Sequence, residues 1–243
     1  MPEQPFPNFP ESGLICAVSR RHFENMSLSY GDTANSLASR KKFLGGLGID
    51  SRDLICAKQT HDDKARCVRR EDKGKGALSY DTAIEDTDAL ITDEPNLPLA
   101  IFTADCLSVF LYDPKAPAIG LVHAGWKSSR KNIIAKAIQL MREKFSSSPE
   151  YLLAAFGPAI RSCCYEVGVD FRGSFPGGVI ARAGRYYLDL PAINKRQMLD
   201  AGVKEANIFD PGACTFCKNE DFFSYRKEGD SSGRIMSVIM LTG

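Results

Sequence analysis

Hydrophobic residues along this chain form short blocks that alternate with amphipathic stretches. Several blocks are too short for independent helices and are bounded by Pro, Gly or Asp, which is typical of buried β-strands. The predicted strands are Leu54 to Ala57, Leu97 to Phe102, Leu107 to Tyr112, Ala118 to Val122 and Tyr151 to Phe156. Two of them follow each other directly around Asp113-Pro114, which favours a mixed sheet over a regular βαβ winding.

Helical periodicity is clearest over residues 128 to 145. One apolar stripe there consists of Ile134, Ala137, Ile138, Met141 and Phe145. Ser128 or Ser129 can cap the start of this helix. A second helix is predicted from Pro191 to Ala201, because proline suits a first helical turn and Gly202 suits a helix end.

Strands mixed with few helices predict an α/β fold in which a mixed β-sheet is covered by helices. The length of 243 residues fits one large domain, which we expect over residues 13–243. The proline-rich residues 1–12 are expected to form a flexible N-terminal arm. The chain has neither the glycine pattern of a dinucleotide-binding turn nor that of a phosphate-binding P-loop.

The charge balance points to a small-molecule partner. Lys and Arg number 31 against 30 Asp and Glu, so no net field attracts nucleic acid or an anionic membrane. No apolar stretch is long enough to span a membrane, and no secretory signal is visible. The eight cysteines are dispersed, which fits a reduced, cytoplasmic protein better than a disulfide scaffold. Whether the protein is a monomer or a homodimer is left open.

Candidate chemistry gathers at His61, Cys106 and His123, which stand at the ends of apolar runs or at breaks in them. Two imidazoles and a thiolate suit zinc or copper, and three protein ligands leave a fourth position free, as in catalytic metal sites. The same residues also suit a metal-free nucleophile, Cys106 activated by a histidine. The third alternative is that Cys106 is a small buried side chain and the histidines are hydrogen-bonded core residues.

Two other cysteine pairs attract attention. Cys214 and Cys217 have the spacing of a zinc knuckle, but no second pair follows them at a suitable distance. Cys163 and Cys164 are adjacent, a poor geometry for one metal ion. We therefore expect buried thiols in both segments.

A series of sequence blocks carries a family resemblance. The blocks include Asp88-Ala89-Leu90-Ile91-Thr92, Leu99 to Cys106, His123-Ala124-Gly125-Trp126, Gly157-Pro158-Ala159-Ile160, Cys164-Tyr165-Glu166-Val167-Gly168, Asp189-Leu190-Pro191, Cys214-Thr215, Phe223-Ser224-Tyr225-Arg226 and Gly233-Arg234. In this order they resemble the YfiH family, also called the polyphenol oxidase or "multicopper laccase domain" family. The chain departs from the family pattern at Ser39-Arg40, where the family has Asn-Arg.

The resemblance implies a fold, a metal site and an activity. The fold is an α/β sandwich shared with bacterial glutamine-deamidating toxins that use a Cys/His pair. His61, Cys106 and His123 match the family's zinc or copper ligands. The implied reaction is phosphorolysis of purine nucleosides (adenosine, inosine, guanosine and methylthioadenosine), with adenosine deamination alongside.

Phosphorolysis requires a cationic group that holds phosphate. Arg40, Arg226 and Arg234 lie in matching family segments, and the hydroxyl of Ser224 could share an anion with Arg226. Asp105 and Glu166 are candidates for general acid and base. If the segment around Asp105 is extended, however, Asp105 and Cys106 point to opposite faces, and Asp105 then supports the site from behind.

Three rival functions make different predictions. A cysteine hydrolase based on Cys106 would keep its activity after chelation but lose it on alkylation. A copper-dependent polyphenol oxidase fits poorly, because laccase chemistry requires several copper ions and this chain has only three histidines. A non-catalytic metal-binding partner protein would bind metal without turning over any nucleoside.

Overall fold

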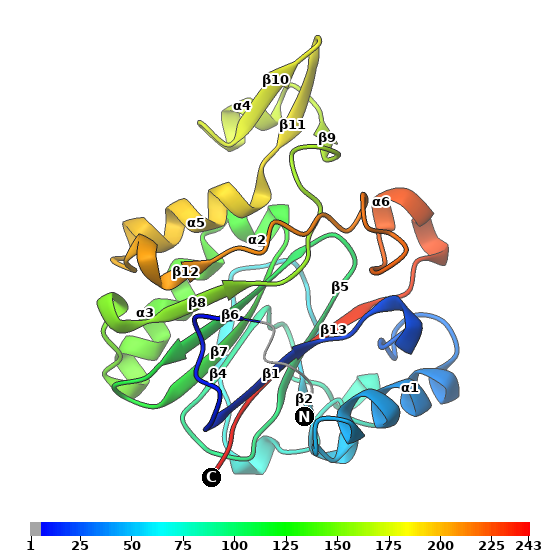
Figure 1. The fold of residues 1–243 in the computed structure, drawn as a ribbon, viewed down its shortest axis with the longest axis vertical. Helices are drawn as coiled ribbons and strands as arrows, with labels where there is room; N and C mark the ends of the chain where they lie inside the picture. Colours follow the sequence, from blue (N-terminus) through cyan, green and yellow to red (C-terminus); the bar gives the residue numbers. More distant parts are fainter. Residues whose placement is uncertain (1–5) are drawn as a thin grey trace.

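The computed structural model describes residues 6–243, in which two β-sheets pack against each other (Figure 1). Across the first sheet the order is β1 (Leu14–Val18), β13 (Ile235–Leu241), β5 (Leu99–Thr103) and β2 (Ile55–Cys56). Across the second it is β12 (Ile208–Phe209), β8 (Leu153–Phe156), β6 (Leu107–Asp113), β7 (Ala118–Ala124), β4 (Ala89–Thr92) and β3 (Ala65–Cys67). Each sheet contains parallel and antiparallel pairs, so both are mixed.

Helices cover the outer faces of the two sheets. The helices are α1 (Thr33–Gly45), α2 (Trp126–Arg130), α3 (Ile133–Phe145), α4 (Phe171–Ser174), α5 (Leu190–Asp200) and α6 (Tyr225–Glu228). A small third sheet of β9 (Glu166–Val167), β10 (Val179–Arg182) and β11 (Arg185–Leu188) projects from one end of the molecule (Figure 1).

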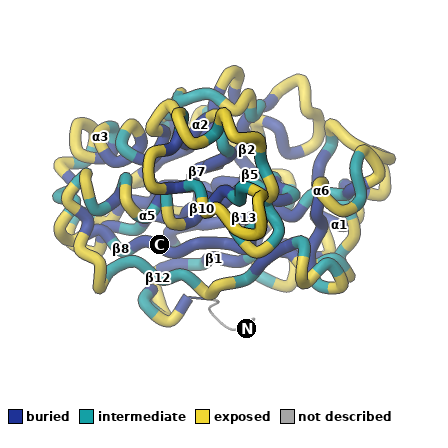
Figure 2. Tube along the Cα trace, turned by 90° about the horizontal axis from the view of Figure 1, so that it is seen from above, coloured by how far each residue is buried: buried dark blue, intermediate teal, exposed yellow. Residues whose placement is uncertain are grey.

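Apolar contacts hold these layers together. Leu99 and Ile239 of the first sheet share a buried cluster with Phe110 and Leu121 of the second. A second cluster joins the outer face of the second sheet to α3 and α5, and a third joins the first sheet to α1. The strands at the centre of the two sheets, β5, β6, β7 and β13, are accordingly buried almost throughout, while α1 and α3 expose their outer sides (Figure 2). The predicted α/β fold with mixed sheets covered by helices is confirmed.

The five predicted strands are all present, with shifted ends. The β7 strand continues two residues beyond the predicted end at Val122, so that His123 lies within the sheet. Every residue of β7 is buried. Continuous apolar sequence, rather than alternation, is expected where both faces of a strand are covered.

The helix predicted over residues 128 to 145 is two helices, α2 and α3. Asn132 separates them with a left-handed backbone (φ 67°, ψ 40°), a conformation that asparagine tolerates better than most residues. The hydroxyl of Ser128 does not cap α3 but donates to the carbonyl groups of His123 and Gly125. The second predicted helix is present as α5, with Asp189 accepting a hydrogen bond from the Ala192 N–H at its start.

The prediction of a flexible arm over residues 1–12 is wrong for its described part. Phe6 and Phe9 are 2% and 4% exposed and belong to the cluster between the two sheets. The Phe6 ring lies 4.7 Å from the Phe110 ring, centroid to centroid. Burying two phenylalanines offsets the entropy lost in ordering so short a segment. Residues 1–5 lie outside the described part.

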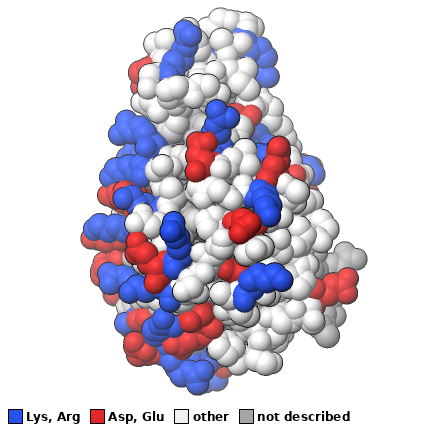
Figure 3. Space-filling model, turned by 90° about the vertical axis from the view of Figure 1, so that its left-hand side faces the viewer, with Lys and Arg blue, Asp and Glu red and all other residues white. Residues whose placement is uncertain are grey.

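Charged side chains of both signs are interspersed on the surface. On the face shown in Figure 3, Lys and Arg stand beside Asp and Glu without an extended field of one sign. None of the helices in the described part of the chain is long and apolar enough to cross a membrane.

Candidate functional site

His61, Cys106 and His123 come together at one end of the sandwich. His61 lies in the loop after β2, Cys106 in the turn between β5 and β6, and His123 in β7. Their nitrogen and sulfur ligand atoms all lie within 4.8 Å of one another, with Cys106 Sγ 3.9 Å from His61 Nε2. Two imidazoles and a thiol at these separations fit a zinc or copper ion.

Asp88 holds two of these three side chains in position. Its buried carboxylate accepts hydrogen bonds from the backbone N–H groups of Thr60, His61 and Asp62. One of its oxygens also lies 2.7 Å from Nδ1 of His123. Since a carboxylate accepts, Nδ1 carries the proton and Nε2 is left to face the cluster, the usual arrangement behind metal-bound histidines.

Asp88 is not among the site residues predicted from the sequence, where it is only the first residue of a family block. The available signal was an acidic residue directly before the apolar run Ala89-Leu90-Ile91, because a carboxylate requires a partner when it is buried.

The cluster favours a charged pair when no metal is bound. Burial opposes ionisation of Cys106, but the neighbouring His123 lowers the pKa of this thiol to about 6. Burial likewise opposes protonation of His123, but Cys106 and Asp88 raise the pKa of its ring to about 9. At neutral pH the pair is therefore a thiolate beside an imidazolium. A thiolate is the form that binds metal and that attacks as a nucleophile.

Gly125 allows the two loops to approach each other. A Cβ atom at this position would lie 3.0 Å from both Cys106 Sγ and His61 Cδ2. Any larger residue would push against two of the cluster side chains.

A cavity of about 490 Å³ opens from the cluster. Its walls combine aromatic rings with cations and a few polar groups. They include Arg40, Gln59, Phe102, Asp105, Trp126, Tyr165, Tyr225, Arg226 and Arg234. This size and composition suit a small ligand with an aromatic part and an anionic part.

The segment at Asp105 turns, so the condition under which Asp105 and Cys106 would point to opposite faces of an extended strand is not met. Asp105 has a φ of 90°, in the region that L residues rarely adopt. Its carboxylate accepts hydrogen bonds from the Thr215 hydroxyl and the Arg226 backbone N–H, both at 2.6 Å. Asp105 thus joins the cluster turn to the segment that carries Arg226.

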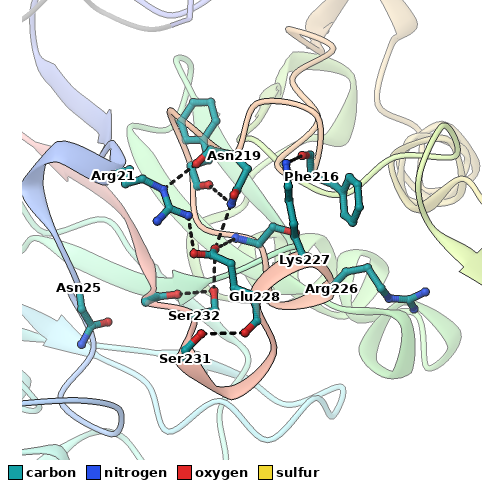
Figure 4. A network of polar contacts seen from close by, with 12 residues as sticks. Arg21, Asn25, Phe216, Asn219, Arg226, Lys227, Glu228, Ser231 and Ser232 are labelled. Atoms are coloured by element: carbon teal, nitrogen blue, oxygen red, sulfur yellow. Dashed lines mark hydrogen bonds and ion pairs between the residues drawn. The ribbon is translucent and has the colours of Figure 1, made fainter.

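Arg226 is one of the residues that line the cavity. Its NH1 group donates to the Glu166 carbonyl, and the guanidinium lies over the Tyr165 ring. Behind it, Glu228 forms an ion pair with Arg21 and accepts from Asn219, which fixes α6 (Figure 4). Arg226 points away from this network (Figure 4).

Arg40 also lines the cavity, but it is buried. It is 2% exposed, donates to the carbonyl groups of Met26, Gly76 and Ala77, and lies over the Phe102 ring. Arg234 lies over the rings of Tyr30 and Tyr225. Among the described residues, no carboxylate forms an ion pair with Arg40, Arg226 or Arg234.

Two predicted site residues lie away from the cavity. The Glu166 carboxylate forms an ion pair with Arg185 in the small third sheet, so it is not positioned as an acid or base. Ser224 is buried at the start of α6, where its backbone N–H donates to Glu228, and its hydroxyl has no hydrogen-bond partner in the described part of the chain.

Comparison with known proteins identifies the family. The family model "Multi-copper polyphenol oxidoreductase laccase" matches residues 15–242. The crystal structure of the Bacillus licheniformis hypothetical protein YfiH superposes with a TM-score of 0.90 at 32% identity, covering 94% of this chain and 93% of that one. This chain belongs to the YfiH family.

Relatives in the YfiH family carry names of purine nucleoside enzymes. The purine nucleoside phosphorylase YlmD of Bacillus subtilis is 33% identical over 233 residues, covering 91% of this chain and 84% of that protein. Adenosine deaminase RL5, from an unknown prokaryotic organism, is 30% identical over 217 residues, covering 86% of this chain and 82% of that protein.

Proposed function

We propose that this protein is a metal-dependent purine nucleoside phosphorylase. Its substrates would be adenosine, inosine, guanosine or methylthioadenosine together with phosphate. The observation that carries the proposal is the cavity itself. It is lined by His61, Cys106 and His123 and by three arginines that form no ion pair with a carboxylate of residues 6–243. The names of the relatives support this choice of reaction.

The arginines supply the phosphate-binding function. A buried cation such as Arg40 is costly without a counter-charge, and backbone carbonyls and one aromatic face compensate only part of that cost. Arg226 is the more accessible of the two, because it is exposed and lines the cavity. A guanidinium binds two phosphate oxygens in one plane, which fixes the anion as well as neutralising it.

In the proposed reaction, a phosphate oxygen forms a bond to C1′ of the ribose while the bond from C1′ to the base nitrogen breaks. The electron pair leaves with the base, which takes up a proton, and the products are ribose 1-phosphate and free purine. Positive charge develops on the sugar, and a nearby bound phosphate stabilises it. The aromatic walls, Trp126 and Phe102 among them, offer faces for the purine ring.

The cluster residues would hold the metal ion. His61, Cys106 and His123 fit zinc or copper by donor type and spacing, and Asp88 orients His123. A bound zinc or copper ion would supply a Lewis acid at this end of the cavity.

The test is a panel of purine nucleosides incubated with metal-loaded protein, with and without phosphate. We expect free base and ribose 1-phosphate only when phosphate is present. Base release at the same rate without phosphate would identify a hydrolase instead. No turnover of any nucleoside would contradict the proposal and favour a non-catalytic metal-binding protein.

Arg226→Ala tests the assignment of the phosphate site. Losing a charge-assisted contact to phosphate should raise the KM for phosphate roughly tenfold or more. Arg185→Ala, which removes an exposed arginine outside the cavity lining, is the matched control. An unchanged KM in Arg226→Ala would move the role to Arg40 or Arg234.

Adenosine deamination is a second candidate activity of the same site, because the relative RL5 is named for it. It consumes water and gives inosine and ammonia, so chromatography distinguishes it from phosphorolysis.

The thiolate–imidazolium pair favours a different rival, a cysteine hydrolase. That rival requires activity in chelated protein and its loss on alkylation, whereas the metal-dependent enzyme loses activity on chelation.

A further inference from the structure

A second cluster of potential metal ligands lies outside the cavity lining. It consists of Cys163, Cys164, Cys214 and Cys217, whose sulfur atoms all lie within 4.8 Å of one another. The first two precede β9, and the other two belong to the segment before α6 (Figure 1). Sequence analysis predicted buried thiols here, but Cys163 and Cys217 are exposed and only Cys214 is buried.

The sulfur separations suit a shared metal ion. Cys217 Sγ lies 3.6 Å from Cys163 Sγ and 3.3 Å from Cys164 Sγ. Four sulfurs bound to zinc at about 2.3 Å in a tetrahedron are about 3.8 Å apart. A disulfide requires about 2.05 Å, so neither of these pairs is at bonding distance. Cys163, Cys164, Cys214 and Cys217 are all free thiols.

The backbone holds the two cysteine segments in register. A parallel bridge pairs Ala159 with Cys214, through the Ala159 N–H to the Ala213 carbonyl and the Thr215 N–H to the Ala159 carbonyl. Backbone N–H groups of Cys217 and Arg161 donate to the Cys214 sulfur. N–H donation to the first sulfur of a C-x-x-C turn stabilises a thiolate, which is the form that binds metal.

We propose that Cys163, Cys164, Cys214 and Cys217 together bind one zinc ion in a closed, four-sulfur structural site, separate from the His61–Cys106–His123 cluster. Four thiolates side by side repel one another, and a divalent cation provides the compensating charge. All four positions of the tetrahedron would be filled by protein, so this site has no place for a substrate.

The site would stabilise one wall of the cavity. The first cysteine segment leads directly into Tyr165, and the second contains Thr215, which holds Asp105. Asp105 in turn fixes the backbone of Arg226. A metal ion joining the two segments would therefore fix the position of the cavity wall relative to the turn that carries Cys106.

Metal analysis of protein purified under reducing conditions, without chelator and with zinc in the growth medium, tests the proposal. We expect about two metal equivalents per chain in the wild type and about one in Cys106→Ala. Cys217→Ser should also lose about one equivalent, and the double variant should be nearly metal-free. Cys67→Ser, which replaces a partly exposed cysteine outside both clusters, should keep the wild-type content.

Cobalt gives a spectroscopic readout of the ligands. Cobalt-loaded Cys106→Ala should show tetrahedral d–d bands and strong sulfur-to-metal charge transfer, and an additional Cys217→Ser substitution should abolish both. Cys106→Ala protein without zinc and without this spectrum overturns the proposal. So does a mass lower by two hydrogens that maps to a disulfide among these four cysteines, because it would indicate a redox pair.

Folding failure of a variant does not end the test. Cys163→Ser replaces another exposed member of the cluster and serves as a second variant. Wild-type protein can also be titrated with a mercurial thiol reagent while a chromophoric chelator reports released zinc. Release in two steps, one of which is absent from Cys106→Ala, supports two sites, and a single step that disappears in Cys106→Ala contradicts the proposal. These readouts do not depend on the proposed reaction.

Discussion

At the scale of single residues, Asp88 connects the proposed metal ligands to the fold. It is fully buried, and its carboxylate accepts hydrogen bonds both from the backbone of the His61 loop and from the ring of His123. One carboxylate therefore sets the position of one ligand and the tautomer of another. An amide at this position would retain the size but not the charge.

Asp88→Asn is expected to weaken zinc binding about ten- to hundredfold, because ligand orientation and basicity both depend on the carboxylate. Competition with a chelator of known affinity measures the change. Asp86→Asn, which removes an exposed carboxylate that pairs with Lys64, is the control and should bind zinc as the wild type does. Equal zinc affinity in Asp88→Asn and the wild type would show that Asp88 does not orient the ligands.

The thiolate character of Cys106 predicts a pH profile for chelated protein. The pKa of Cys106 is lowered to about 6, so the reactive thiolate is present above that value and is lost as the pH falls through it. Alkylation of Cys106 by iodoacetamide should reach half its maximal rate near pH 6, whereas an ordinary cysteine does so near about 8.5. Peptide mapping by mass spectrometry separates Cys106 from the other cysteines. A midpoint above 8 would argue against the thiolate–imidazolium pair.

At the scale of secondary structure, the break between α2 and α3 is the clearest departure from the periodicity. The apolar stripe of α3 is where the sequence predicts it, and Ile134, Ala137 and Met141 are buried. The helix nevertheless starts anew at Ile133, because Asn132 is left-handed. The shorter helix before the break, α2, begins directly after Gly125, next to the cluster.

Asn132→Ala should destabilise the protein by about 1 kcal/mol, because alanine pays the steric cost of the left-handed backbone. Asn132→Gly adopts that backbone freely and should remain within a few tenths of a kcal/mol of the wild type. Urea unfolding followed by circular dichroism measures both. Equal free energies of unfolding for the alanine variant and the wild type would contradict this prediction, because the left-handed backbone between α2 and α3 would then carry no steric cost.

At the scale of the whole molecule, the N-terminal segment closes the space between the two sheets. Phe6 belongs to the same buried cluster as Leu99 and Phe110, one from each sheet. The segment that contains Phe6 therefore contributes to the core, although proline-rich sequence suggested an unattached arm.

Phe6→Ala is expected to lower the free energy of unfolding by about 3 kcal/mol, because it leaves a cavity between the sheets. Phe6→Leu fills most of that space and should cost clearly less. Chemical denaturation with both variants checks the order. A loss below about 0.5 kcal/mol for Phe6→Ala would mean that the segment does not support the core.

The sequence by itself predicted the type of several elements and the candidate residues of the site, whereas α1, β1, β4 and β13 were not among its predictions. Apolar blocks predicted five strands and two helices because burial on one or both faces imposes a period on the sequence. The resemblance to the YfiH family gave the family, and His61, Cys106 and His123 stood out because polar residues that interrupt apolar runs are costly unless they are used.

Tertiary structure decided which residues meet. Cys164 and Cys217 lie 53 positions apart in sequence, yet their sulfurs are 3.3 Å apart, because the bridge at Ala159 aligns two segments that sequence spacing treats as unrelated. Asp88 gained its role only when β4 and β7 paired and placed it beside His123. Glu166, chosen from the sequence, was turned toward Arg185 by the pairing of β9 with β11. Hydrophobic periodicity is local and therefore readable along the chain, whereas partners in a polar cluster are set by strand pairing between distant segments, which no local pattern records.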